Sequence, residues 1–150
     1  MIEIREEHPA DVAAIRDVNA SAFSVLLSLV AIRQGRVVGH IMYSPASVGS
    51  TMGAALGPMA VLLAYQRQGI GSRLIEAGNR KLEMEGCPFI VVVGHANYYP
   101  RFGFRPASTC GIACEWDVPD DVFMVLVMDP EKMRGVTGLA RYRSEFSNVS

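Results

Sequence analysis

The stretch YQRQGIGSRLIEAGNRKLEMEG, from Tyr65 to Gly86, decides the fold. Small or apolar side chains recur through it at helical spacing, which predicts an amphipathic helix that Gly86 closes as a C-terminal cap. These side chains are Ile70, Leu74, Ile75, Gly78 and Leu82. Gly69 and Gly71 stand at the start of the helix, where each glycine costs backbone entropy. Such a pair indicates that an anionic group comes close to the backbone there.

The start of a helix is a natural anion site. Its first N–H groups have no intrahelical partner, and the helix dipole places partial positive charge on them. Glycines leave no β-carbon in the way, so a strand, a glycine-containing turn and a helix together bind phosphate. The basic residues between Gln66 and Lys81 outnumber the single acid, Glu76, although the whole chain has a net charge of −1. The alternative is a tight turn followed by a solvated basic face.

The bulk composition predicts one globular domain, residues 1–150. Half of the residues are hydrophobic and 19% are charged, which is typical of a folded protein. A slightly negative net charge argues against sequence-independent nucleic-acid binding. No apolar run approaches the roughly 20 residues that a membrane-spanning helix needs. The charged N-terminus does not resemble a signal peptide, so we expect a cytoplasmic protein without membrane partners.

Three cysteines, Cys87, Cys110 and Cys114, form no dense framework and fit a reducing compartment. Cys110 and Cys114 have no second ligand pair at zinc spacing, so we expect no metal site.

The rest of the chain alternates between strand and helix patterns. A first strand is expected at 2–5, and a helix begins near Pro9 and runs to about Ser21. Residues 27–48 indicate a hairpin around Gln34-Gly35, and Ala55–Tyr65 a strand with an irregularity at Gly57-Pro58. A buried strand at 88–94, a short turn or helix at 97–104, and a strand pair at 114–116 and 123–128 follow. The apolar positions of the tail, 136–146, either close the molecule's own sheet or contribute to a dimer.

Two common phosphate motifs do not fit this segment. The nucleotide P-loop requires Lys-Ser/Thr after its last glycine, and no such pair follows Gly71. The dinucleotide fingerprint requires a third glycine and belongs to the first strand of a parallel sheet, whereas Gly69-x-Gly71 follows the fourth expected strand.

A set of motifs, in order along the chain, resembles the GNAT acetyltransferase superfamily. Gln66-x-x-Gly69-x-Gly71 resembles its acyl-CoA signature, and YYPRFGF resembles its last-helix motif, with a tyrosine four residues before Gly-Phe. Together with VVGHI, LGPMAV, QGIGSRLI and GVTGLARYRSEF, these motifs are similar to one bacterial subgroup of N-acetyltransferases. The resemblance implies an α/β (α+β) GNAT-like fold, a mixed and mostly antiparallel sheet with helices on both faces.

The resemblance also implies acetyl-CoA as the acyl donor. Backbone N–H groups of Arg67 to Ser72 would hold its pyrophosphate, and its pantetheine arm would run between residues 59–61 and 90–94. The N–H of Val61, or of a neighbour, would polarise the thioester carbonyl. The cofactor-binding residues expected on this basis are Met59, Ala60, Val61, Gln66, Arg67, Gln68, Gly69, Ile70, Gly71, Ser72, Arg73, Asn97, Tyr99 and Arg101.

Acetyl transfer to an amine needs an acid and a base. Tyr99 matches the family position of the general acid that protonates the CoA sulfur, and the adjacent Tyr98 is the expected core residue. The base is open, because Ala55–Tyr65 contains no acid where family members often have a glutamate. The candidates are His40, His95, Glu115 and Asp117, of which His95 and Glu115 are preferred; a water chain to solvent would also serve.

The chain departs from the subgroup between the first helix and the strand at 27, where other members have a longer stretch. A short connection implies an open acceptor cleft, suited to a bulky acceptor such as a protein terminus or lysine; the other explanation is a missing segment. We therefore expect the acceptor to be either a small-molecule amine or a protein amine. The apolar tail leaves both a monomer and a homodimer open. Two other functions stay open: a non-catalytic acyl-CoA-binding or regulatory module, and a binder of another phosphate ligand.

Overall fold

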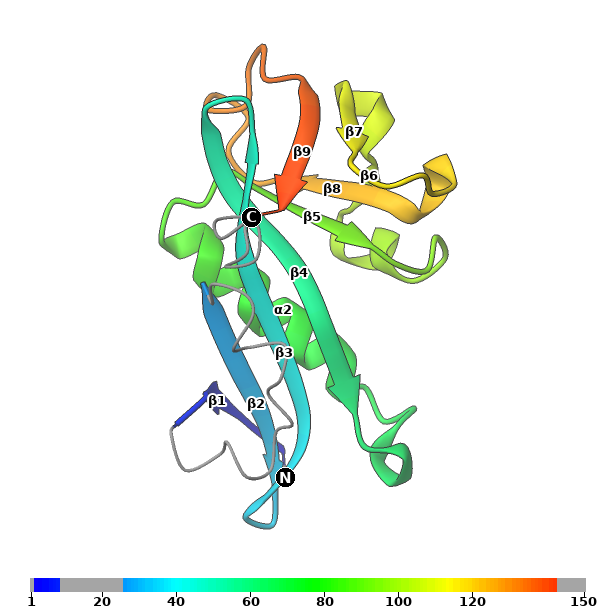
Figure 1. The fold of residues 1–150 in the computed structure, drawn as a ribbon. Coiled ribbons are helices and arrows are strands. Elements are labelled where there is room, and N and C mark those ends of the chain that lie inside the picture. Colours follow the sequence, from blue (N-terminus) through cyan, green and yellow to red (C-terminus); the bar gives the residue numbers. More distant parts are fainter. Residues whose placement is uncertain (1, 9–25, 143–150) are drawn as a thin grey trace, which may run out of the picture.

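The computed structural model describes residues 2–8 and 26–142, which form a long twisted sheet crossed by one α-helix (Figure 1). The strands are β1 (Ile2–Glu6), β2 (Leu27–Arg33), β3 (Arg36–Val48), β4 (Thr51–Val61), β5 (Phe89–Val93), β6 (Arg105–Pro106), β7 (Ile112–Cys114), β8 (Phe123–Val127) and β9 (Gly138–Tyr142). The α-helix is α2 (Ile70–Met84). Short 3-10 helices are η2 (Leu63–Tyr65), η3 (Tyr99–Phe102), η4 (Ala107–Cys110) and η5 (Asp120–Val122).

The sheet is mixed and mostly antiparallel, as expected. Its strand order is β1-β2-β3-β4-β5-β8-β6, and β9 pairs with both β3 and β7. Among the described strands, only β4–β5 and β7–β9 are parallel pairs. The β4–β5 pair needs a crossover connection, and α2 supplies it. In the view of Figure 1, α2 lies behind β2, β3 and β4.

The β2–β3 hairpin turns at Gln34 and Gly35. Both residues have positive φ, 53° and 75°, as a two-residue hairpin turn with the twist of its strands requires. The expected hairpin is therefore confirmed.

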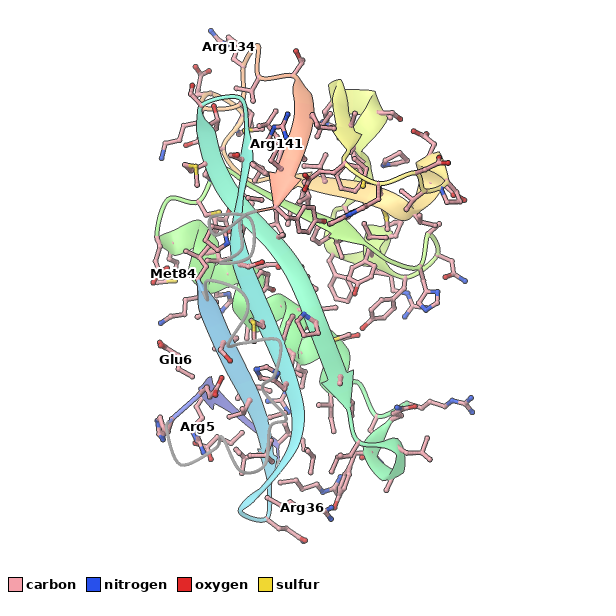
Figure 2. All side chains as sticks on the ribbon, viewed as in Figure 1. Arg5, Glu6, Arg36, Met84, Arg134 and Arg141 are labelled. Atoms are coloured by element: carbon pink, nitrogen blue, oxygen red, sulfur yellow. The ribbon has the colours of Figure 1, made fainter. Side chains whose placement is uncertain are left out.

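Helix α2 buries the face that its spacing predicts: Ile70, Leu74, Ile75, Gly78 and Leu82 are buried. They pack against the inner face of β2–β4, where Ile41 and Tyr43 have no exposed surface. Gly86 ends the helix with a φ of 84°, as a C-terminal cap does. Lys81 Nζ lies 2.7 Å from a carboxylate oxygen of Glu6, which joins α2 to β1. Figure 2 shows the side chains on the ribbon, with Glu6 labelled.

Several sequence expectations need correction. The strand expected at Ala55–Tyr65 begins earlier and ends at Val61, because 63–65 turn into a 3-10 helix. The strand expected at 114–116 is wrong in its bounds, because β7 ends at Cys114, whereas β8 matches the strand expected at 123–128. The two do not pair with each other: β7 pairs with β9, and β8 with β5 and β6. Strand β9 comes from the tail and closes the molecule's own sheet. The helix expected between Pro9 and Ser21, which would cover the second face, lies outside the described residues.

Candidate active site

Strands β4 and β5 separate beyond one short paired stretch. Their parallel ladder consists of Ala54 opposite Ile90 and Ala55 opposite Val91. Farther along, β4 bulges: Leu56 pairs with Tyr43, and Met59 already pairs with Ile41. Gly57, whose φ is 140°, lies in this shift. The irregularity expected at Gly57-Pro58 is therefore confirmed, and it opens a gap between the two strands.

The edge of β4 that faces this gap carries backbone groups that have no partner on the described strands. The N–H of Leu62 donates to the carbonyl of Val38 on β3 (2.8 Å). Because backbone groups alternate between the two edges of a strand, the N–H groups of Met59 and Val61 point the other way, into the gap. The amide side chain of Gln66 donates to the Val61 carbonyl on this edge (3.0 Å). Polar backbone atoms need partners, so this edge is suited to an extended amide-containing ligand.

The first turn of α2 lies beside the gap. Gly69, the N-terminal cap, is left-handed with a φ of 80°, and Arg67 has a φ of 65°. The N–H of Arg73 donates to the Gly69 carbonyl (3.1 Å), so the N–H groups of Ile70 to Ser72 precede the helical ladder. Left-handed residues among successive N–H groups form an anion-binding concavity.

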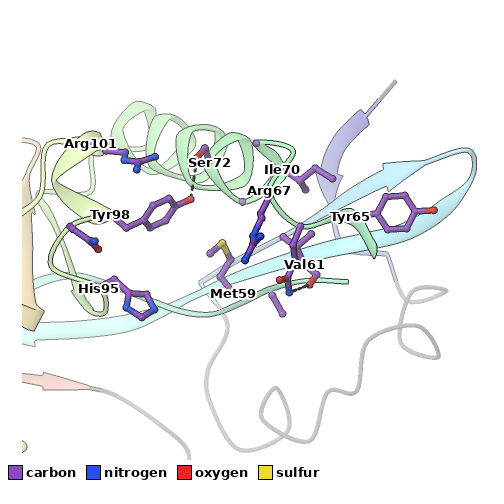
Figure 3. Close-up of a pocket in the computed structure, with 14 residues that line it drawn as sticks. Met59, Val61, Tyr65, Arg67, Ile70, Ser72, His95, Tyr98 and Arg101 are labelled. Atoms are coloured by element: carbon purple, nitrogen blue, oxygen red, sulfur yellow. Dashed lines mark hydrogen bonds between the residues drawn. The ribbon is translucent and has the colours of Figure 1, made fainter. Parts of the chain in front are cut away.

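The gap and the helix start share one cleft of about 1110 Å³. It is lined by Met59, Ala60, Val61, Tyr65, Gln66, Arg67, Gly69, Ile70, Gly71, Ser72, His95, Asn97, Tyr98 and Arg101. Figure 3 shows Arg67 pointing into the cleft and Arg101 at its other end, beside Tyr98. One side of the cleft is therefore an exposed strand edge, and the other is a helix N-terminus flanked by guanidinium groups.

Tyr98 crosses the cleft towards α2. Its hydroxyl lies 3.1 Å from the Ser72 hydroxyl, and the Arg101 guanidinium lies 5.4 Å from its ring centre (Figure 3). A β-carbon at Gly71 would be 3.4 Å from the Tyr98 hydroxyl and 3.5 Å from the sulfur of Met59, so position 71 faces the cleft and not the core. The expectation that Tyr98 is a core residue is wrong: it is half-buried and lines the cleft.

Tyr99 is the buried member of the pair, with 7% of its surface exposed. Its ring packs edge-on against Tyr98 and Phe104. Burial, with a smaller contribution from Tyr98, raises the pKa of Tyr99. Its hydroxyl has no hydrogen-bond partner among the described residues. Every fully buried side-chain oxygen or nitrogen of those residues does have a partner, so the Tyr99 hydroxyl is not fully buried. The hydroxyl is therefore protonated at neutral pH and reaches accessible space.

Tyr99 is not among the residues that line the cleft, and three other expected site residues do not line it either. The Gln68 amide accepts from Arg33 (2.9 Å) on the outer side of the turn. Arg73 donates to the Ile2 carbonyl (3.2 Å), because its place on the helix turns it towards β1. Glu115 is exposed and accepts from the Tyr142 N–H on β9 (2.8 Å). Its place depends on the β7–β9 pairing, which sequence reasoning did not include.

Two cleft residues were not expected, Tyr65 and Tyr98. Tyr65 ends η2, and the Arg33 guanidinium lies 5.8 Å from its ring centre. A signal for Tyr98 existed in the adjacent pair of tyrosines, of which only one can face the core.

Within residues 2–8 and 26–142, no group of three or more metal-ligating side chains comes together. No described helix is long and apolar enough to span a membrane.

Known proteins share both the sequence pattern and the fold. The family model of the acetyltransferase (GNAT) domain matches residues 26–106. YjhQ, an uncharacterized N-acetyltransferase of Escherichia coli K12, is 40% identical over 100 residues, which cover 63% of this chain and 55% of YjhQ. The chain thus spans about half the length of that relative. YhbS, an uncharacterized N-acetyltransferase of the same organism, is 28% identical over 94% of this chain and 86% of its own.

Two solved structures have the same architecture. Escherichia coli YhbS, in complex with CoA, matches 97% of this chain and 92% of its own with a TM-score of 0.86 and 28% identity. A GNAT family acetyltransferase from Brucella melitensis, in complex with acetyl-CoA, matches 97% of this chain and 98% of its own, with a TM-score of 0.74 and 31% identity. The open mixed sheet is thus shared with solved acetyltransferases of the GNAT family. This chain belongs to the GNAT acetyltransferase family.

Proposed function

We propose that this protein transfers the acetyl group of acetyl-CoA to a primary amine, which attacks the thioester directly in a ternary complex. The observation that carries the proposal is the junction of the β4–β5 gap with the open N-terminus of α2. An acyl-CoA has an anionic pyrophosphate and an amide-rich arm, and this junction offers N–H donors for the first and a free strand edge for the second. The CoA and acetyl-CoA complexes of the two similar structures support the assignment.

The residues of the cleft divide the binding among them. The N–H groups from Arg67 to Ser72 would hold the pyrophosphate, and the side chains of Arg67 and Arg101 would add positive charge. The β4 edge would pair with the pantetheine amides. The N–H of Met59 or Val61 would then point at the thioester oxygen and stabilise the negative charge that develops on it.

Tyr99 is the proposed acid. The thiolate that leaves when the C–S bond breaks takes the hydroxyl proton, and the attacking amine returns a proton to the phenolate. Burial raises the pKa of Tyr99, which keeps the hydroxyl protonated until the thiolate forms and makes the phenol a weaker acid. Among the candidate bases, His95 lines the cleft and Glu115 does not.

The first test is thermal unfolding with and without acetyl-CoA, with ATP and NAD as control ligands. Acetyl-CoA at about 100 times its dissociation constant should raise the midpoint by about 5–10 °C. Gly71→Trp should abolish the shift, because its side chain would fill the cleft. A shift with ATP or NAD but not with acetyl-CoA would refute the assignment.

Turnover is tested by thiol release with a panel of primary amines: polyamines, aminoglycosides, amino acids and peptides with a free N-terminus or lysine. Tyr99→Phe should bind acetyl-CoA as the wild type does and lose most of the turnover. Binding without thiol release across the whole panel would indicate the non-catalytic module instead.

A further inference from the structure

The loop between η2 and α2 carries the first of the anion-binding N–H groups, yet its own backbone makes few contacts. Among the described residues, the N–H groups of Arg67, Gln68 and Gly69 donate to no backbone carbonyl. Arg67 has a φ of 65°, which a residue with a side chain rarely adopts, and such a conformation persists only where the surroundings hold it. The order of this loop therefore depends on side chains.

The residues on either side of Arg67 are both held by their side-chain amides. The Gln66 amide donates to the Val61 carbonyl at the end of β4 (3.0 Å). The Gln68 amide oxygen accepts from a guanidinium N–H of Arg33 (2.9 Å), and its nitrogen makes a longer contact with a carbonyl of η2 (3.5 Å). Arg33 is the one partner among these that is distant in sequence, 35 positions before Gln68. It therefore ties the loop to another part of the sheet.

Arg33 is itself well fixed. It is the last residue of β2, and its backbone pairs with Arg36 across the hairpin and with Ile2 of β1. Its guanidinium lies 5.8 Å from the centre of the Tyr65 ring, which packs against the core under α2. A cation is attracted to the face of an aromatic ring. The Arg33 guanidinium is thus held at two points, by Tyr65 and by Gln68.

Arg33 has no direct place in the cleft. Arg67 lines the cleft and Arg33 does not. Its ladder partner Arg36 carries the same charge at the same end of the hairpin, but it is exposed and takes part in none of these contacts among the described residues (Figure 2). The two arginines therefore differ in their contact with the loop and not in charge.

We infer that Arg33 is a positioning residue for the acyl donor: through Gln68 and Tyr65 it holds the loop before α2 in the conformation that receives the pyrophosphate. This inference rests on the proposed function. A loop that is ordered before binding loses less conformational freedom when the ligand arrives, so the affinity is higher. The effect should be confined to donors with a pyrophosphate, because the pantetheine arm would pair with the β4 edge instead.

The test compares two acyl donors. Acetyl-CoA carries the pyrophosphate, and S-acetylpantetheine has the same thioester and amides without it. Arg33→Ala should weaken acetyl-CoA binding in isothermal titration by about 3- to 10-fold. It should raise the KM for acetyl-CoA by a similar factor and leave kcat nearly unchanged. The kcat/KM for S-acetylpantetheine, measured by thiol release with the best amine of the panel, should stay near the wild-type value.

Two further variants separate position from charge. Gln68→Ala removes no charge and should reproduce the loss. Arg33→Ala and Gln68→Ala together should lose little more than either change alone, because both break one contact. Arg36→Ala removes the same charge as Arg33→Ala and should bind acetyl-CoA as the wild type does. If Arg33→Ala does not fold, Gln68→Ala decides the matter, because that side chain is exposed.

Four outcomes would overturn the positioning role: no loss in Arg33→Ala, equal losses for the two donors, additive losses in the double variant, or a loss in Arg36→Ala as large as that in Arg33→Ala. The last would assign the effect to total charge. Wild-type protein that does not bind acetyl-CoA would refute the proposed function and this inference with it. Normal binding by the wild type and by Arg33→Ala would refute the inference alone.

Discussion

The ring of Tyr99 lies directly on the backbone of Gly94, at the end of β5. A β-carbon on residue 94 would overlap Cε2 of the ring and lie 2.9 Å from Cδ2. Phe104 packs edge-on against the ring, with the ring centres 5.7 Å apart. The end of the buried strand and the core therefore fix where the Tyr99 hydroxyl points.

Gly94→Ala should consequently lower turnover without changing the binding of acetyl-CoA. The added methyl group forces the Tyr99 ring to move, and overpacking of this kind costs about 1–3 kcal/mol of stability. A displaced acid should reduce kcat by roughly 10- to 100-fold, measured by thiol release, while the acetyl-CoA thermal shift persists.

The control for this prediction is the double variant. If Gly94 acts through the Tyr99 hydroxyl, Gly94→Ala should add little to the kinetic defect of Tyr99→Phe. Fully additive losses would show that Gly94 affects catalysis by another route.

The close contact between Gly78 and Tyr43 should reverse the usual effect of replacing a helical glycine by alanine. Gly78 lies inside α2, where alanine normally gains about 0.5–1 kcal/mol over glycine. A β-carbon at position 78 would instead overlap the ring and hydroxyl of Tyr43, whose oxygen donates to Asn79 (2.8 Å). Gly78→Ala should therefore destabilise the protein by about 1–3 kcal/mol in urea unfolding. In a Tyr43→Leu background the same substitution should lose that penalty; an unchanged penalty would contradict the contact.

The helix and the gap were predictable from the sequence because their signals are local. The spacing from Ile70 to Leu82 determines one buried face, and Gly57-Pro58 cannot form a regular ladder. By contrast, η3 begins at Tyr99, and this turn decides which of two adjacent tyrosines enters the core. Strand β9, with exposed residues such as Leu139, has no strong strand pattern and forms only because β3 and β7 offer edges. Glu115 was wrongly expected at the site for the same reason, because its position depends on the β7–β9 pairing, which no local pattern indicates.

Two tyrosines outside the active site should make the fold sensitive to alkali. Burial raises the pKa of Tyr43 above its ordinary value of 10.0, and burial together with Cys114 and Glu115 does the same for Tyr142. Above about pH 10 the unfolded chain loses these protons and the folded protein keeps them, so stability falls as pH rises. The slope is about 1.4 kcal/mol per pH unit for each tyrosine. Urea unfolding across this pH range measures the fall in stability. Tyr142→Phe should reduce the slope by about 1.4 kcal/mol per pH unit, and an unchanged slope would contradict the raised pKa of Tyr142.

Arg67 precedes α2 and Arg73 lies in its first turn, so the two arginines can be compared as a matched pair in a test of the acetyl-CoA site. Arg67 lines the cleft, whereas Arg73 is hydrogen-bonded to the Ile2 carbonyl. Arg67→Ala should weaken acetyl-CoA binding by roughly 5- to 30-fold, since a charge-assisted hydrogen bond contributes about 1–2 kcal/mol when partly screened by solvent. Arg73→Ala should leave the affinity nearly unchanged. Isothermal titration at two salt concentrations distinguishes them, because only the Arg67 contribution should fall as salt screens it. Equal losses in both variants would mean that the basic face acts through its total charge and not through a guanidinium in the cleft.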